Sequence, residues 1–273
     1  MRLFVFGPGY AARAVAAAAG APMLATTRDG RDGTIRFDDA DAVRAGLAAS
    51  THVLSSVPPD KVGDPVLRQY ENALTGRWLG YLSSTGVYGD TGGAWVDEDA
   101  AADRGRRPLR NRADADWMAL GARVFRLPGI YGPGRSPLDR VARGEAHRTG
   151  VAGQVFSRVH VADLARGVVA GFEAPAGAYN LADDLPAAQD EVVLYAAQLL
   201  GIAPPPIVPL EQLSPAARGF HAENRRVASG KAKRVLNWQP RYPDYRAGLR
   251  ALSATTSPTA ASPAPAAASD VQR

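Results

Sequence analysis

A glycine-rich turn close to the N-terminus has the residues needed to bind a diphosphate. The segment from Gly7 to Ala12 follows the pattern G-x-G-x-x-A, between an apolar run, Leu3–Phe6, and an alanine-rich stretch. Such a turn presents backbone amides at the start of a helix, where phosphate groups bind. We expect Gly7 to allow the tight turn, Gly9 to let the diphosphate approach, and Ala12 to let the helix pack closely. The pattern predicts a dinucleotide site that includes Tyr10, and the alternative is a purely structural turn.

The residues that end the second expected strand indicate which nicotinamide nucleotide binds. Thr27 and Arg28 stand where NAD-selective proteins place an acidic residue for the ribose hydroxyls. A guanidinium beside hydroxyl groups binds a 2′-phosphate through charge-assisted hydrogen bonds. We therefore expect NADP(H) to be favoured over NAD(H), with one alternative, in which Asp29 pairs with Arg28 on the surface.

Apolar runs that alternate with helical stretches predict the elements that would position this turn. The alternation is typical of βαβ units whose parallel sheet is buried on both faces. The expected strands are Leu3–Phe6, Met23–Thr26, Thr34–Phe37, Val53–Val57, Trp78–Ser83 and Val124–Leu127. The expected helices are Tyr10–Ala19, Ala40–Ala49, Val66–Thr75 and Arg112–Leu120. The sequence thus predicts an α/β protein with a doubly wound parallel sheet of the Rossmann type. We expect Ser55, Ser56 and Val57, which end the fourth strand, near the nicotinamide half of the cofactor.

The second half of the chain predicts a smaller lobe. The pattern loosens after Gly134, and the expected elements are Ser136–Ala146, Phe156–Val161, Leu164–Phe172 and Gln189–Leu200. We predict an NADP(H)-binding domain over residues 1–134, to which parts of 150–180 return, and a mixed α/β substrate lobe over 135–252. Residues 253–273 are rich in Ala, Pro and Ser, which predicts a disordered tail.

The composition argues against several classes of protein. The chain has no cysteine, which excludes disulfides, thiolate metal sites and cysteine nucleophiles, and indicates a reducing cytoplasm. The arginines behind the net charge of +5 are scattered along the sequence, so we expect no nucleic-acid partner. The apolar run at the N-terminus is too short for a signal peptide or a membrane span. We expect a cytoplasmic monomer or homodimer that binds a small-molecule substrate and no membrane.

Four further segments resemble the NAD(P)-dependent epimerase/dehydratase family of the extended short-chain dehydrogenase/reductases. They are Ser83–Gly89 (SSTGVYG), Arg126–Gly134 (RLPGIYGPG), Arg158–Ala165 (RVHVADLA) and Tyr179–Asp184 (YNLADD). Together with Lys233–Arg241 they are most similar to the atypical bacterial branch of that class. The resemblance implies an NAD(P)(H)-dependent oxidoreductase or epimerase-like enzyme that acts on a small hydroxyl or carbonyl compound, with nucleotide sugars among the candidates.

The resemblance also implies roles for individual residues. The family's catalytic serine or threonine, four residues before the tyrosine of V-Y-G, corresponds to Ser84, whose hydroxyl would hydrogen-bond the reacting substrate oxygen. The acidic pair of the sugar dehydratases is replaced by Thr85 and Gly86, which argues against dehydratase chemistry. The opening turn also departs from the G-x-x-G-x-x-G of the extended class.

The family's catalytic Tyr-x-x-x-Lys pair is missing from this sequence. No lysine lies between Lys61 and Lys231, and none of the nine tyrosines has a lysine four positions later. Arg106 and Arg110 fall approximately where the pair should be. We expect Arg110 to contact the cofactor ribose, whereas Arg106 cannot replace a phenolic acid because arginine stays protonated.

Another proton donor is therefore needed if the protein is an enzyme. The candidates are Tyr88, Tyr131 and His160, of which Tyr88 joins Ser84 as the expected catalytic residue. The alternatives are packing at the strand end for Tyr88 and structural hydrogen bonding for His160. We interpret the cluster Asp97–Asp99 as a solvated face and expect no metal site. A competing hypothesis is a non-catalytic NADP(H)-binding or sensor protein, and a third is a scaffold that binds no nucleotide.

Overall fold

Seven parallel strands form the central sheet. The structure is a computed structural model that describes residues 1–255. In spatial order the strands are β10 (Gly177–Asn180), β7 (Arg123–Leu127), β5 (Trp78–Ser84), β4 (His52–Ser55), β1 (Leu3–Phe6), β2 (Met23–Thr27) and β3 (Ile35–Arg36). The chain moves outward from β1 first to one edge of the sheet and then to the other. This order confirms the predicted doubly wound Rossmann sheet.

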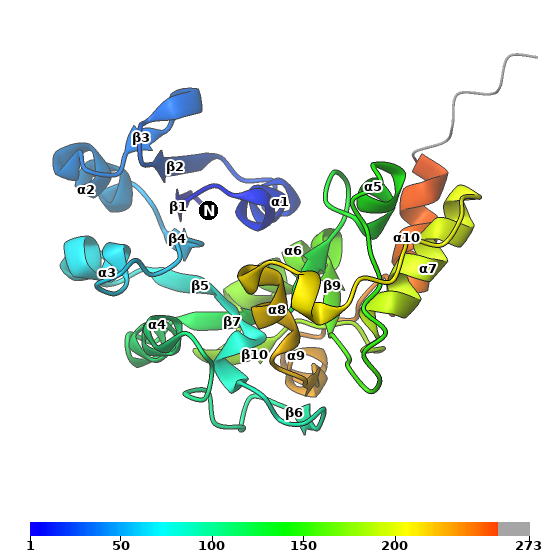
Figure 1. The fold of residues 1–273 in the computed structure, drawn as a ribbon. Coiled ribbons are helices and arrows are strands. Elements are labelled where there is room, and N and C mark those ends of the chain that lie inside the picture. Colours follow the sequence, from blue (N-terminus) through cyan, green and yellow to red (C-terminus); the bar gives the residue numbers. More distant parts are fainter. Residues whose placement is uncertain (256–273) are drawn as a thin grey trace, which may run out of the picture.

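Helices cover both faces of this sheet (Figure 1). One face carries α1 (Tyr10–Ala19), α6 (Val161–Ala170) and α9 (Gly230–Val235), and the other carries α2 (Ala40–Ala48), α3 (Pro65–Tyr70) and α4 (Pro108–Ala119). Successive side chains of a strand point to opposite faces. Leu3 and Val5 of β1 therefore join the core under α1 and α6, whereas Phe4 and Phe6 join the core under α2 and α3. Burial of both faces accounts for the continuously apolar strands.

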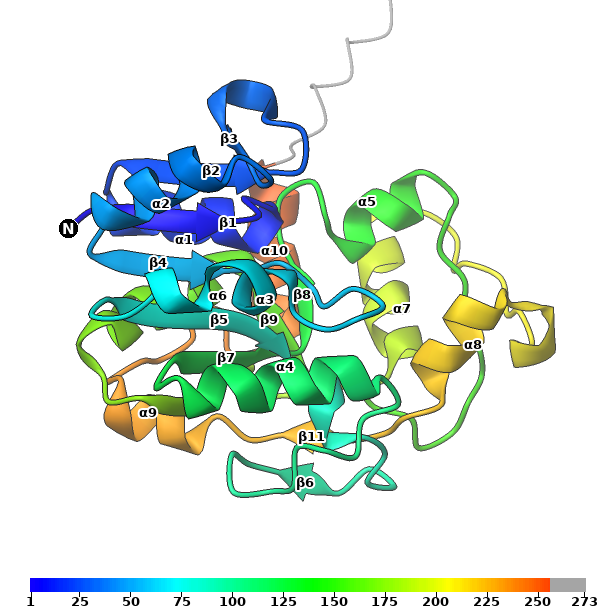
Figure 2. The ribbon, with the colours of Figure 1, turned by 90° about the vertical axis from the view of Figure 1, so that its left-hand side faces the viewer.

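A smaller group of helices lies at the carboxyl ends of the central strands. Helices α5 (Pro137–Ala142), α7 (Gln189–Leu200) and α10 (Tyr245–Thr255) share a separate apolar core. The remaining elements are α8 (Pro215–His221) and two short parallel pairs, β8 (Gly129–Tyr131) with β9 (Arg158–His160) and β6 (Trp95–Val96) with β11 (Arg226–Val227). The 3-10 helices are η1 (Arg31–Gly33), η2 (Glu71–Ala73), η3 (Thr85–Tyr88), η4 (Gly171–Glu173) and η5 (Leu210–Gln212). Figure 2 shows the arrow of β5 pointing toward α5, α7 and α8, so the carboxyl edge of the sheet faces these helices.

Most element bounds lie within two residues of those predicted, and two early helix starts have local causes. Helix α4 starts four residues early, at Pro108, because proline at a first helical position presets the backbone dihedral. Helix α6 starts three residues early, at Val161, because the His160 side chain accepts a hydrogen bond from the Ala162 amide and caps the helix. Both signals are local, so the sequence contained them.

The C-terminal end of the described chain is helical further than predicted. Residues 253–255, expected to begin a disordered tail, form the last turn of α10, because Leu249 and Leu252 are buried in the core shared with α7. The rest of the predicted tail, 256–273, lies outside the described residues. Among the helices of residues 1–255, none has the length and apolar character needed to span a bilayer.

A buried ion pair holds the carboxyl ends of β5 and β7 against α4. The Asp114 carboxylate accepts a hydrogen bond from Arg126, with Arg126 Nη2 and Asp114 Oδ1 2.8 Å apart, and another from the Ser83 hydroxyl at 2.6 Å. Arg126 also donates to the Tyr88 hydroxyl, which in turn donates to Asn180 Oδ1 at 2.7 Å. These bonds join β5, α4, β7, η3 and β10. Since an unpaired buried charge is costly, the network fixes how the strand ends lie relative to one another.

One member of the Asp97–Asp99 cluster belongs to this interior, which corrects the expectation of a solvated face. Glu98 Oε1 accepts a hydrogen bond from the backbone N–H of Asn180 at 2.6 Å, and burial raises the pKa of Glu98. Its neighbours Asp97 and Asp99 are exposed. Within the part of the chain that the structure describes, no group of three or more His, Cys, Asp or Glu side chains lies close enough together to hold a metal ion.

A second buried carboxylate fastens the C-terminal segment to the sheet. Asp163 on α6 is fully buried, and its two oxygens accept hydrogen bonds from the backbone amides of Arg241 and Tyr242, at 2.7 and 2.9 Å. The Trp238 indole donates to the Asp163 carbonyl oxygen at 2.9 Å. The segment that leads into α10 is therefore bound to the sheet through α6.

The substitution Asp114→Asn should strongly destabilise the fold. It would leave the Arg126 guanidinium buried without a carboxylate, which costs roughly 3–5 kcal/mol of unfolding free energy. The matched control is Asp116→Asn on the same helix, whose carboxylate lies 3.6 Å from Arg112 on the surface and should contribute about 0–1 kcal/mol. Urea unfolding followed by circular dichroism measures both. Equal losses in the two variants would contradict the importance of the buried pair.

Candidate functional site

The glycine turn is held in place by residues at the end of β4. Gly7 has a φ of +72°, and a Cβ added to it would lie 3.0 Å from Val57 Cγ2. The Ser56 hydroxyl donates a hydrogen bond to the Gly7 carbonyl oxygen. Gly9 is the N-cap of α1, no side chain caps this helix, and Ala12 is buried against the sheet. The structure thus brings five of the predicted cofactor-binding residues together around a helix N-terminus whose first amides are not used by a cap.

The Y-G-P-G segment adds a positive charge to this turn. The Tyr10 hydroxyl donates to the Pro133 carbonyl oxygen at 3.1 Å, and the Arg135 guanidinium carbon lies 5.7 Å from the centroid of the Tyr10 ring. Sequence reasoning missed Arg135. The available signal was its place directly after the segment that resembles the family's R-x-x-x-x-Y-G-P-G.

The side chain of Arg28 has no acidic partner. Asp29 instead lies 3.7 Å from Arg31 Nε and accepts a hydrogen bond from the Thr27 hydroxyl at 3.2 Å. The Thr27 hydroxyl also accepts from the Gly30 amide, which shapes the loop after β2. Arg28 is exposed and makes no hydrogen bond or ion pair within residues 1–255. The geometry therefore does not support the alternative in which Asp29 neutralises Arg28.

Two buried hydroxyls on either side of β1 have no hydrogen-bond partner among residues 1–255. They belong to Thr26 on β2 and Ser55 on β4, which both lie opposite Phe6 in the sheet register. An unpaired buried hydroxyl costs free energy, and native structures contain few of them. Both residues lie next to the Gly7 turn: the Gly7 amide donates to the Thr26 carbonyl oxygen, and Ser55 precedes Ser56, which binds the Gly7 carbonyl oxygen.

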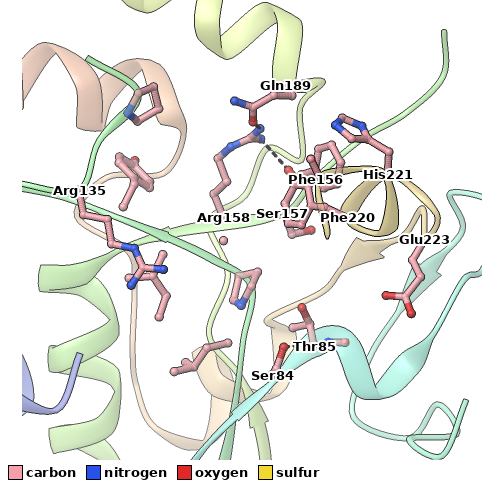
Figure 3. A pocket seen from close by; sticks show the side chains of 18 of the residues that line it. Ser84, Thr85, Arg135, Phe156, Ser157, Arg158, Gln189, Phe220, His221 and Glu223 are labelled. Atoms are coloured by element: carbon pink, nitrogen blue, oxygen red, sulfur yellow. Dashed lines mark hydrogen bonds between the residues drawn. The ribbon is translucent and has the colours of Figure 1, made fainter. Parts of the chain in front are cut away.

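A cavity of about 860 Å³ separates the carboxyl ends of β5 and β7 from the helical lobe. Ser84 at the end of β5 lines it, together with Tyr131 of β8, Arg158 of β9, Gln189 of α7 and His221 of α8. Figure 3 shows Ser84 and Thr85 on one side of this space, with Arg158 and Gln189 on the opposite side. A pocket of this size, lined from several elements, is typical of a small-molecule site.

The Ser84 side chain lines this cavity, and no acceptor for its hydroxyl proton lies within residues 1–255. Its Oγ accepts a hydrogen bond from the Gly86 amide at 3.1 Å and caps η3. Because that bond uses a lone pair, the hydroxyl proton is left for a group inside the cavity.

The structure places Tyr88, predicted to be catalytic, in the interior and not on the cavity wall. It is 1% exposed and is not among the residues that line the cavity. Its proton is donated to Asn180, its oxygen accepts from Arg126, and burial raises the pKa of Tyr88. The hydroxyl of Tyr88 is therefore engaged in the interior behind Ser84, and its catalytic role stays a prediction.

The other two donor candidates differ in their access to the cavity. His160 is buried outside the lining, caps α6 through Nδ1, and has its pKa lowered by burial. Tyr131 lines the cavity, but burial raises its pKa and its hydroxyl lies 3.5 Å from the Asp244 carbonyl oxygen. His147 and His221 also line the cavity, and sequence reasoning identified neither.

Among the charged residues that line the cavity, most are arginines. Arg110 lines it and makes no side-chain hydrogen bond or ion pair within residues 1–255, whereas Arg106 Nε lies 3.6 Å from Glu223. The lining arginines are Arg106, Arg107, Arg110, Arg135, Arg140, Arg143, Arg158 and Arg225, and the acidic residues are Asp139 and Glu223. The cationic character of this space was not predicted, because these side chains come from segments far apart in the sequence.

Comparison with solved structures places the chain in a known fold. A functionally unknown conserved protein from Silicibacter pomeroyi is 39% identical, covers 93% of this chain and 98% of its own, and superposes with a TM-score of 0.81. A human epimerase family protein solved with NADPH is 18% identical over 93% of this chain and 99% of its own, with a TM-score of 0.73. UDP-glucose 4-epimerase of Thermus thermophilus, solved with NAD, is 21% identical over 93% and 98%, with a TM-score of 0.69. The latter two similarities establish the fold alone.

Sequence comparison adds one curated relative. A 3-diazoavenalumate denitrifying reductase of Streptomyces sp. is 30% identical over 142 residues, which are 48% of this chain and 46% of that protein. The chain thus spans about half the length of this relative. No family model matches the sequence. On the identity over nearly its whole length, the chain belongs to the same family as the Silicibacter pomeroyi protein, and it shares its fold with the human epimerase family protein and the Thermus thermophilus epimerase.

Proposed function

We propose that this protein is an NADP(H)-dependent oxidoreductase that acts on a small hydroxyl or carbonyl compound beside Ser84. The observation that carries the proposal is the uncapped start of α1, which opens at the same carboxyl edge of the sheet as the Ser84 cavity. The names of relatives support it, since two proteins of this fold were solved with NADPH or NAD and the Streptomyces relative is named a reductase.

The residues around the turn fit a dinucleotide. The first amides of α1 and the Arg135 guanidinium would bind the diphosphate, as backbone donors and cations do in other phosphate sites. Arg28 and Thr27 would bind a 2′-phosphate, for which Arg28 is available because no acidic residue pairs with it. When bound, the nicotinamide supplies or accepts a hydride.

The residues of the cavity would then position the substrate. The Ser84 hydroxyl would hydrogen-bond the substrate oxygen that gains or loses a proton. Arg110 would bind a ribose hydroxyl of the nucleotide, where the family resemblance places a lysine. We also propose that residues 1–134, together with α6 and β10, form the nucleotide-binding domain and that the lobe within 135–252 binds the substrate. We propose that the protein is cytoplasmic and is a monomer or homodimer.

A second candidate function is a non-catalytic NADP(H) sensor. The missing Tyr-x-x-x-Lys pair and the engaged hydroxyl of Tyr88 favour it. Both candidates require nucleotide binding, so only turnover separates them.

Replacement of Arg28 by alanine tests the choice of nucleotide. The variant should lose about 1–3 kcal/mol of binding free energy for NADPH and much less for NADH, because only NADPH carries the 2′-phosphate. Isothermal titration calorimetry with both nucleotides measures the difference. The control is Arg31→Ala in the same loop, whose guanidinium lies near Asp29 and should matter less. Equal losses for NADPH and NADH in Arg28→Ala would contradict the assignment.

Replacement of Ser84 by alanine tests whether the cavity is catalytic. The rate of NADPH oxidation should fall by about 10²-fold or more, because the hydrogen bond to the reacting oxygen is lost. The rate is measured by the absorbance of NADPH with a panel of carbonyl compounds and sugar nucleotides. The Kd for NADPH should stay close to that of the wild type. If the wild type binds NADPH and oxidises it with none of these compounds, the sensor function is favoured.

A further inference from the structure

Arg158 is a buried cation that no carboxylate contacts. The residue is 6% exposed, it lines the cavity, and it takes part in no ion pair within residues 1–255. Its Nη1 donates to the carbonyl oxygens of Phe156 and Ala187 at 2.8 and 2.9 Å, and its Nη2 donates to Gln189 Oε1 at 3.0 Å. All three acceptors are neutral, so they fix the orientation of the guanidinium without compensating its charge.

The other deeply buried arginine shows what is missing. Arg126 is 5% exposed and has the Asp114 carboxylate at 2.8 Å, and hydrogen bonds to Asp114 raise the pKa of Arg126 despite its burial. Burial lowers the pKa of Arg158, as expected for a cation removed from water without a contacting anion. Since proteins pair buried charges and residues 1–255 place no carboxylate in contact with Arg158, a bound anion is a suitable partner for it.

Asp183 is close enough to interact electrostatically with Arg158, but it does not neutralise it. Asp183 is 2% exposed and forms no salt bridge, and burial raises its pKa to about 8. Burial thus favours the uncharged form of this carboxyl group, and within residues 1–255 it forms no ion pair with Arg158.

The acidic residues of the cavity are already engaged. Glu223 lies 2.9 Å from Arg225 and 3.6 Å from Arg106, and Asp139 accepts a hydrogen bond from the Ser136 amide at 2.8 Å in the capping box of α5. Among residues 1–255, both acidic side chains of the cavity wall are thus engaged by other groups and not by Arg158.

Arg158 keeps donors available for such an anion. A guanidinium has five N–H donors, and three are used by the neutral acceptors. The Nε proton and one Nη2 proton have no partner within residues 1–255, and a carboxylate or phosphate can accept two such bonds. The stacked rings of Phe156 and Phe220, with centroids 4.6 Å apart, line the cavity beside Arg158 (Figure 3).

We propose that the substrate is an organic anion, whose carboxylate or phosphate group binds Arg158 while its reacting oxygen lies at Ser84. The proposal rests on the proposed function in that it assigns the anion to the substrate. The two residues line one cavity from opposite sides, so they hold the ends of one molecule. The aromatic wall contacts the apolar part between these ends.

Matched small probes test the anion site without requiring turnover. Phenylacetate and phenyl phosphate are the anionic probes and phenylacetamide is the neutral one, measured by saturation-transfer NMR on the full chain with and without NADPH. We expect at least one anion to bind at least about tenfold more tightly than the amide, because it gains charge-assisted hydrogen bonds. The probe that binds more tightly identifies the acid group as carboxylate or phosphate. Absence of any preference for an anion at millimolar concentration overturns the proposal.

Variants then assign the preference to one side chain. Arg158→Gln should remove the preference for the anion, whereas Arg234→Gln, an exposed arginine of α9 outside the cavity, should retain it. If Arg158→Gln lacks the wild-type circular dichroism spectrum, Arg158→Lys replaces it and should bind the anion more weakly than the wild type. An unchanged anion preference in a folded Arg158 variant overturns the assignment. Because the probes are also measured without NADPH, failure of nucleotide binding is seen separately from failure of the anion site.

Discussion

The arrangement of the site depends on the buried pair between Asp114 and Arg126. Asp114 accepts a hydrogen bond from the Ser83 hydroxyl, so the Ser83 side chain is held in the interior beneath α4. Successive side chains of a strand alternate in direction, and Ser84 is therefore presented on the other side, where the cavity lies. The same guanidinium binds Tyr88, which links β5 to β10 through Asn180. The buried ion pair thus fixes Ser83 in the interior, and the alternation of the strand leaves Ser84 on the side of the cavity.

The parts of the structure that depend on local signals could be predicted from the sequence. The signals for the first strand, Leu3–Phe6, and for the Gly7 turn lie in consecutive residues, and the bounds of β1 and α1 were predicted to the residue. The role of Tyr88 could not be derived in this way. Its V-Y-G motif resembles a catalytic segment, but its hydroxyl is engaged by Asn180, 92 residues further along the chain. Such a contact exists only after the sheet has formed, so no local pattern reports it.

The cationic character of the cavity likewise could not be predicted from local sequence patterns. Along the sequence the arginines are scattered, which gave no sign of a shared location in the fold. In the fold, Arg110 on α4, Arg158 on β9 and Arg225 beside β11 line one cavity. Parallel sheets bring the ends of distant strands to one edge, and the lobe closes over that edge. A modest net charge is thereby concentrated where a small molecule would bind.

The bonds made by Asp163 set a limit on how far the chain can be shortened from its C-terminal end. A deletion that reaches Tyr242 and Arg241 would remove both backbone amide donors and leave the buried Asp163 carboxylate with the half-exposed Arg166 guanidinium, 3.2 Å away, as its charged partner among residues 1–255. These residues are distant in sequence from the opening turn, but they stabilise the same fold as the first strand. A protein shortened to this point would therefore be expected to accumulate poorly in cells.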